Sequence, residues 1–132
     1  MKIKLILQIT LILISSLASK AQMSSENVPN KIEFEQTKEL NGILTKIKET
    51  NENGVAFTAY ILKLKSPINV IAPNDNYETQ NNVKEIEVKF DNVKVPKPDT
   101  YLNKEIIVKG DLYNEQTIHD HRPVIMISGE IK

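Results

Sequence analysis

The 132-residue sequence contains no cysteine, four glycines and a single arginine. The absence of cysteine excludes a disulfide scaffold, thiol catalysis, thiolate metal sites and the acylated cysteine of a lipoprotein anchor. No Gly-x-Gly-x-x-Gly or Gly-x-x-x-x-Gly-Lys string occurs, which excludes the usual phosphate-cradling loops. Neither sign of charge is in excess, because the sequence has 17 Lys plus Arg and 17 Asp plus Glu. Nucleic-acid-binding proteins usually carry a basic stripe, so this class is disfavoured.

The N-terminus has the order of features of a secretory signal peptide. Residues 1–4 carry two lysines, residues 5–17 are uncharged and rich in Leu and Ile, and Ser19 and Ala21 supply the small residues that a signal peptidase needs. The apolar block is shorter than the about 20 residues of a permanent membrane helix. We therefore expect residues 1–21 to be cleaved, leaving no stable membrane anchor. Export without cysteines fits a bacterial periplasm or secreted space, since small eukaryotic extracellular domains are commonly disulfide-stapled.

Cleavage would also change the charge balance. Without Lys2, Lys4 and Lys20 the chain keeps 14 basic against 17 acidic residues, a net charge of −3. A mildly acidic domain is a poor partner for nucleic acid or anionic membranes. We expect a monomer whose partner is a protein or a small ligand.

The remaining chain reads as a short leader and one domain. Residues 22–31 are polar and are expected to form a flexible leader, and residues 32–132 form the domain. Turn-forming residues 50–54 predict a hairpin. Alternating and β-rich segments predict five strands, at residues 39–49, 55–65, 85–90, 104–113 and 123–131.

Breaks within these segments indicate curvature. Gly42 and Gly110 predict bulges or sharp bends, and Pro67 predicts a bend or an edge position. Pro96 and Pro98 exclude a long helix between residues 92 and 103 and allow one helical turn after Pro98. Five strands in about 100 residues predict an all-β fold, a small five-stranded OB-like Greek-key barrel. An open sandwich would need about seven shorter strands.

Three segments, residues 61–70, 104–112 and 117–124, read Leu-x-Leu-x-x-Pro-Ile, Lys-x-Ile-x-Val-x-Gly-x-Leu and Thr-x-His-x-His-x-Pro-Val. Their order and spacing resemble those of a bacterial family described only as domain of unknown function 4431. Asn103 stands where that family tends to have Gly, and Asp120 interrupts what is often an unbroken His run. The resemblance implies an exported protein with an OB-like barrel, and it implies no activity.

One cluster could carry chemistry, because residues 119–122 hold both histidines and the only arginine. In an OB-fold the connection between the fourth and fifth strands flanks the ligand-binding face. If this segment is extended, His119 and His121 point to one side and Asp120 and Arg122 to the other. We predict an exported, non-enzymatic binding or accessory module that contacts its ligand through these four residues and Thr117.

Other interpretations of the cluster stay open. The two imidazoles could chelate one Zn²⁺ or Cu²⁺, with Glu115 or Asp111 as a further ligand. The same loop could instead be pinned by its own side chains, with Asp120 capping backbone N–H groups and Thr117 closing a hydroxyl-based turn. Alternatively, Arg122 and the imidazoles could contact an anion or a protein surface.

Catalytic groupings are harder to find. The serines after residue 21 lie in no nucleophile-elbow string and have no His at a recognisable motif spacing. Glu85 and Glu87 share the polar face of one predicted strand, where solvation explains both carboxylates. A hydrolase or transferase is therefore the least favoured alternative. Few aromatic residues and an acidic balance likewise argue against oligonucleotide binding.

Overall fold

A computed structural model describes residues 30–117 and 119–132, so the predicted signal peptide and most of the predicted leader lie outside the described residues. Within the described ranges, no helix is long and apolar enough to cross a membrane. The elements, in chain order, are β1 (Asn30–Glu33), β2 (Thr37–Thr50), β3 (Ala56–Ile71), β4 (Gln80–Phe90), the 3-10 helix η1 (Pro98–Tyr101), β5 (Glu105–Asn114) and β6 (Val124–Ile131).

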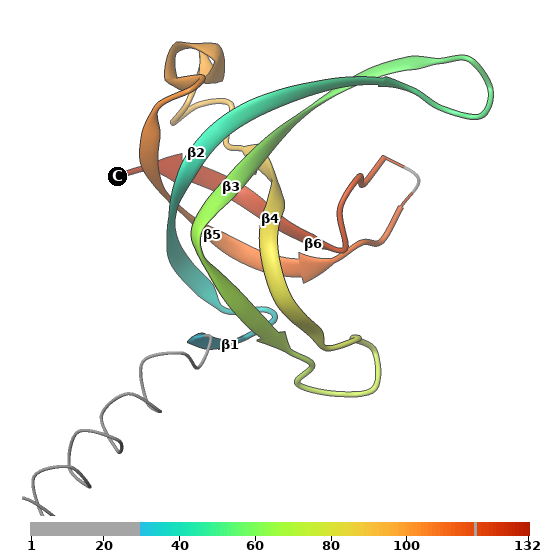
Figure 1. Cartoon of the computed structure of the whole chain (residues 1–132), viewed down its shortest axis with the longest axis vertical. Coiled ribbons are helices and arrows are strands. Elements are labelled where there is room, and N and C mark those ends of the chain that lie inside the picture. The colour runs from blue at the N-terminus through green and yellow to red at the C-terminus, as the bar shows by residue number, and fades with distance from the viewer. Residues whose placement is uncertain (1–29, 118) are drawn as a thin grey trace, which may run out of the picture.

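Strands β2 to β6 close into a barrel (Figure 1). β2 pairs antiparallel with β3 and with β5, β3 pairs antiparallel with β4, and β5 pairs antiparallel with β6. A parallel pairing of β4 with β6 completes the ring. The strand order around the barrel is therefore β2-β3-β4-β6-β5, and the predicted all-β, OB-like barrel is confirmed.

The additional strand β1 is absent from the sequence prediction, which assigned its first two residues to the leader. β1 pairs in parallel with the end of β3, from Asn30 beside Ile68 to Glu33 beside Ile71. The β2–β3 pairing stops at Leu64 of β3. The C-terminal end of β3 would therefore present an open edge, and β1 covers it. β1 has only four residues and one apolar side chain, Ile32, so its sequence shows no alternation from which a strand could be predicted.

The β5–β6 register shifts between Lys109 and Asp111, as the bulge predicted at Gly110 requires, whereas both pairings of β2 run through Gly42 without a shift. A Cβ on Gly42 would lie 2.3 Å from the carbonyl oxygen of Lys63, and one on Gly110 would lie 2.8 Å from that of Ile127. Both glycines thus let two backbones approach where a side chain would clash. The β3–β4 register shifts on the stretch that contains the exposed Pro67. β3 continues through this bend to Ile71, beyond its predicted end.

The core fills the barrel and both of its ends. Phe34 stacks on Tyr77 at one end, with ring centroids 5.2 Å apart, and Tyr60 meets Phe90 edge to face at 5.5 Å. Burying each large aliphatic side chain stabilises the fold by about 1.5–3 kcal/mol. The interior side chains with no exposed surface are Leu44, Leu62, Val70, Ile86, Val108, Leu112 and Met126.

The connection between β4 and β5 contains the single helical turn expected after Pro98. Asp99 in this turn accepts hydrogen bonds from the Tyr60 hydroxyl at 2.5 Å and from Lys46 Nζ at 3.1 Å. Asn103 follows with φ of 63°, in the left-handed region that Gly and Asn adopt most readily. Asn103 therefore suits this turn as a Gly would.

Candidate functional site

Asp120 organises the connection between β5 and β6, residues 115–123. Its side chain is 2% exposed and forms an ion pair with Lys89 of β4. The same carboxylate accepts hydrogen bonds from the backbone N–H groups of Gln116 at 2.7 Å and Thr117 at 3.0 Å. Burial raises the pKa of Asp120, but Lys89 and the two N–H donors outweigh it and hold that pKa below its usual range.

Thr117 completes this turn. Its hydroxyl oxygen accepts a hydrogen bond from the backbone N–H of His119 at 3.2 Å. This is the hydroxyl-based turn expected from the sequence, and Asp120 caps the donors on its other side. The loop-pinning interpretation of Asp120 and Thr117 is therefore confirmed.

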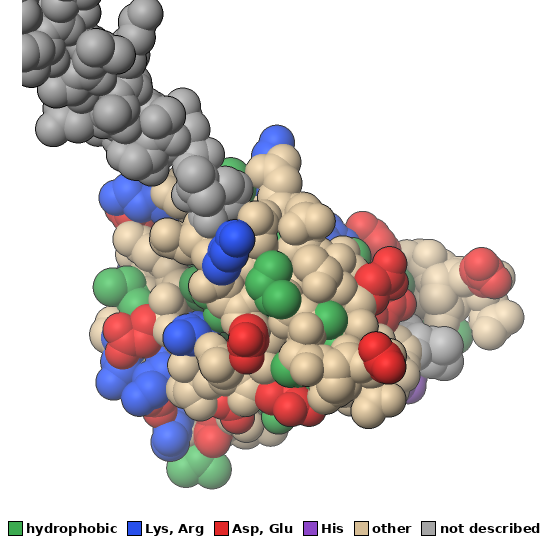
Figure 2. All heavy atoms as spheres, turned by 90° about the horizontal axis from the view of Figure 1, so that it is seen from below, with side chains coloured by type: hydrophobic (Ala, Val, Ile, Leu, Met, Phe, Trp, Pro, Cys, Tyr) green, Lys and Arg blue, Asp and Glu red, His purple; other side chains and the backbone are tan. Residues whose placement is uncertain are grey.

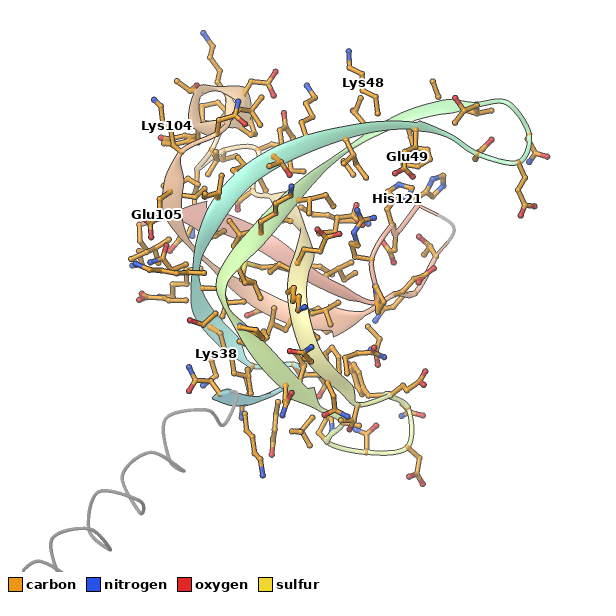
Figure 3. All side chains as sticks on the ribbon, in the orientation of Figure 1. Lys38, Lys48, Glu49, Lys104, Glu105 and His121 are labelled. Carbon is orange, nitrogen blue, oxygen red and sulfur yellow. The ribbon has the colours of Figure 1, made fainter. Side chains whose placement is uncertain are left out.

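The two loop residues after Asp120 contact further residues of β4. The backbone N–H of His121 donates to Glu87 Oε2 at 2.6 Å, and its ring stacks on Phe57, with centroids 3.7 Å apart and planes 4° from parallel. Arg122 Nε donates to Glu85 Oε1 at 2.7 Å, and its Nη1 donates to the carbonyl of His121. Figure 3 shows His121 pointing from its loop toward the hairpin formed by β2 and β3.

Consecutive loop residues 120, 121 and 122 thus contact alternate residues 89, 87 and 85 of β4. Alternate residues of a strand lie on one face, so the loop runs over the outward face of β4. Glu87 is consequently only 4% exposed, and the prediction that solvent covers this carboxylate is wrong. The residues that pair with Glu87 on the neighbouring strands, Ile61 and Ile125, are each 1% exposed. In other OB-folds this face binds ligands, and here the chain covers it itself.

The contacts agree with one part of the predicted division of the cluster, because Asp120 and Arg122 both turn toward β4, where they pair with Lys89 and Glu85. The two histidines do not share a surface, because a turn at His119 interrupts the extended conformation that the prediction assumed. His119 is exposed, whereas His121 is half-buried against Phe57.

The described part of the chain contains no group of three or more His, Cys, Asp or Glu side chains placed to hold a metal ion. His119, His121 and Glu115 are thus not gathered into one ligand set. Asp111, the other candidate ligand, instead accepts a hydrogen bond of 2.5 Å from the hydroxyl of Thr37 on β2.

A hollow of about 700 Å³ lies between the β3–β4 connection and the start of the β5–β6 loop. Figure 2 looks at this end of the barrel, and the charged side chains visible in the half where the two connections lie are mostly Asp and Glu. In the lining that the structure describes, all charged residues are acidic, and amides supply most of the other polar groups. The lining consists of Asp75, Asn76, Tyr77, Glu78, Gln80, Asn114, Glu115, Gln116, Thr117 and Pro123.

Direct hydrogen bonds hold the two walls of this hollow together. Asn114 Oδ1 accepts from the backbone N–H of Glu78 at 2.8 Å, and Asn114 Nδ2 donates to the carbonyl of Glu78 at 3.3 Å. The same Nδ2 donates to the carbonyl of Pro123 at 3.4 Å. Asp120 fixes the backbone of Gln116 and Thr117 on one wall, so the hollow is preorganised.

Sequence reasoning found one wall of the hollow and missed the other. Thr117 and Glu115 are candidates from the sequence, but no residue of the β3–β4 connection is. Its Asn- and Asp-rich composition was a signal of polar turns, and it carries no information on the loop that the connection faces.

No family model, curated protein or solved structure matches this chain. The resemblance to domain of unknown function 4431 therefore stays a prediction. What the protein does has to be inferred from the shape, charge and hydrogen bonding of the hollow and of the loop beside it.

Proposed function

We propose that this protein is an exported, non-enzymatic binding module whose ligand site is the hollow between the β3–β4 connection and the β5–β6 loop. One observation carries the proposal: a hollow of about 700 Å³ has the carboxylates of Asp75, Glu78 and Glu115 as the only charged groups among the described residues that line it. Its size falls in the range of small-molecule sites. Export is supported by the order of basic, apolar and small residues over residues 1–21.

The lining selects the chemistry of the ligand. Carboxylates accept charge-assisted hydrogen bonds from ammonium groups, which are stronger than hydrogen bonds between neutral groups. The side-chain amides of Asn76, Gln80 and Gln116 add neutral donors and acceptors. We therefore propose a small, hydrophilic ligand that carries amines. An anionic ligand would be repelled by these carboxylates.

The covered face of β4 supports placing the site in the hollow. A ligand on that face would have to displace the contacts of Asp120, His121 and Arg122 with β4. The hollow needs no such displacement, and its walls are already held by Asn114 and Asp120. A site ordered before binding loses less conformational entropy when the ligand arrives.

The lining also favours binding over catalysis. Its ten residues include no His, Cys, Ser or Lys, the side chains that most often act as nucleophiles or general bases together with carboxylates. Thr117 Oγ1 already accepts the N–H of His119 in the turn. The residues of the hollow thus suit recognition of a ligand better than its conversion.

Calorimetric titration of the purified protein with spermidine, glucose and citrate tests this proposal. We expect saturable binding of spermidine alone, weakened up to about fivefold by Glu78→Gln and by Glu115→Gln, because exposed ion pairs are worth about 0.2–1 kcal/mol each. Glu52→Gln, at the tip of the β2–β3 hairpin, is the matched control and should bind like the unchanged protein. Binding of citrate instead of spermidine, no saturable binding of spermidine, or an equal loss in the control would overturn the proposal.

A further inference from the structure

Two Asn-Gly dipeptides occur in the sequence, Asn41–Gly42 within β2 and Asn53–Gly54 at the tip of the β2–β3 hairpin. Asparagine is a thermolabile residue, and a following glycine leaves the backbone nitrogen open because it has no Cβ. We propose that Asn53 is a site of spontaneous deamidation and that Asn41, with the same neighbour, is protected by the fold.

The reaction needs only the chain and water. The backbone nitrogen of Gly54 attacks Cγ of Asn53, a C–N bond forms, and the side-chain amide leaves as ammonia. The product is a five-membered succinimide. Water then opens the ring at one of its two carbonyls, which gives aspartate or isoaspartate at position 53.

The surroundings of Gly54 leave room for this attack. Asn53 and Gly54 are exposed, and a Cβ built on Gly54 would meet no atom within 4 Å. The β3–β4 pairing begins at Tyr60 and the β2–β5 pairing ends at Ile43, so the hairpin beyond them is two-stranded. Figure 1 shows this arm projecting from the barrel. A two-stranded arm opens locally at low cost.

The surroundings of Gly42 are the opposite. It pairs with Leu64 of β3 and with Ile106 of β5 in the middle of the barrel wall. A Cβ at this glycine would lie 2.3 Å from the carbonyl oxygen of Lys63, so the backbone of β3 packs closely against it. The side-chain oxygen of Asn41 is itself buried. Closing a succinimide here would require opening the barrel.

Asn51 sets how fast the tip can react. Its side-chain oxygen accepts the N–H groups of Asn53 at 3.0 Å and Val55 at 2.9 Å, and its carbonyl accepts the N–H of Gly54 at 3.0 Å. The attacking nitrogen is thus tied to Asn51 until the turn opens. Removing the side chain of Asn51 loosens that turn.

Deamidation would have a local consequence. It places a carboxylate next to Glu52, and the isoaspartate form adds one carbon to the backbone of the turn. The protein would therefore accumulate as charge variants with the difference confined to the hairpin tip. The β3–β4 connection, which forms one wall of the hollow, lies at the opposite end of the barrel in Figure 1, and binding in the hollow should be unaffected.

Peptide mass spectrometry of the full-length protein, aged in mildly alkaline buffer, tests the proposal. A synthetic peptide of residues 49–57 is aged in parallel, and the protein is sampled once half of this peptide has converted. We expect position 53 to convert at least about tenfold faster than position 41, because it requires local and not global opening, and Asn51→Ala to accelerate it further. Equal rates at the two positions, or an intact Asn53 in both the protein and Asn51→Ala, would overturn the proposal.

Discussion

The β5–β6 loop and the tip of the β2–β3 hairpin are both connections rich in polar, turn-forming residues, yet they are held in different ways. The loop is clamped from outside, since Asp120 and Arg122 pair with β4 and His121 stacks on Phe57. Among the described residues, the tip is held from within, by the hydrogen bonds that Asn51 accepts and by the one that its backbone N–H donates to Val55. Composition alone does not distinguish the two, because the difference lies in what each connection packs against.

This difference has a consequence for function. A connection that packs on the sheet keeps its backbone groups at fixed positions, as a binding wall requires. A connection that projects into solvent has few contacts to lose when it opens, so its backbone reacts more readily. The proposed ligand site and the proposed deamidation site fall on the corresponding connections.

Asp120→Ala should have the largest effect, because it removes the residue that fixes the β5–β6 loop to β4. The substitution removes the partner of Lys89 and leaves the N–H groups of Gln116 and Thr117 without their acceptor. Because Lys89 is 38% exposed, solvent compensates part of the ion pair, and we expect a loss of about 2–3 kcal/mol in the free energy of unfolding. Denaturant unfolding monitored by circular dichroism measures it.

Glu52→Ala at the hairpin tip serves as the control for that measurement. Glu52 is exposed and lies in the connection held from within by Asn51, so its removal should change the free energy of unfolding by no more than about 0.5 kcal/mol. If the two variants lose equal stability, the clamp on the β5–β6 loop is not what distinguishes the two connections.

Acid should weaken the clamp in a specific direction. The pKa of Asp120 is lower in the folded protein than in the unfolded chain, so the ionised carboxylate stabilises the folded state. Its contribution to stability is fully present above the unfolded value of about 4 and is lost as pH falls through the folded value. The stability gap between the protein and Asp120→Asn should therefore narrow below about pH 4. A gap that stays constant or widens on acidification would contradict this sign.

The parts of the fold that the sequence predicts are those that depend on local patterns. Alternation of side chains located the strands of the barrel, and Gly110 located the irregularity in the β5–β6 pairing because a missing side chain has a local meaning. The turn made by Asp120 and Thr117 was likewise predictable, since both groups bond backbone within four residues. These features depend on neighbours in the chain.

The errors concern contacts between distant segments. Glu87 was assigned to solvent, but it is covered by His121, 34 positions later in the chain. One wall of the hollow was missed because Glu78 and Asn114 meet across 36 positions. The strand β1 was missed because its pairing partner, the free end of β3, exists only after β3 has bent. None of these contacts leaves a periodic signal in the sequence.

The smallest predicted effect concerns the stack of His121 on Phe57, which joins the clamped loop to the hairpin arm. Aromatic pairs contribute about 0.5–1.5 kcal/mol beyond the area that they bury, and both rings are partly exposed here, which favours the lower end. A double-mutant cycle with His121→Ala and Phe57→Ala isolates this term from other losses of each substitution. We expect a coupling of about 0.5 kcal/mol and faster amide exchange at the hairpin arm in both single variants. Strictly additive losses would mean that the arm and the loop are held independently, and the clamp would then end at β4.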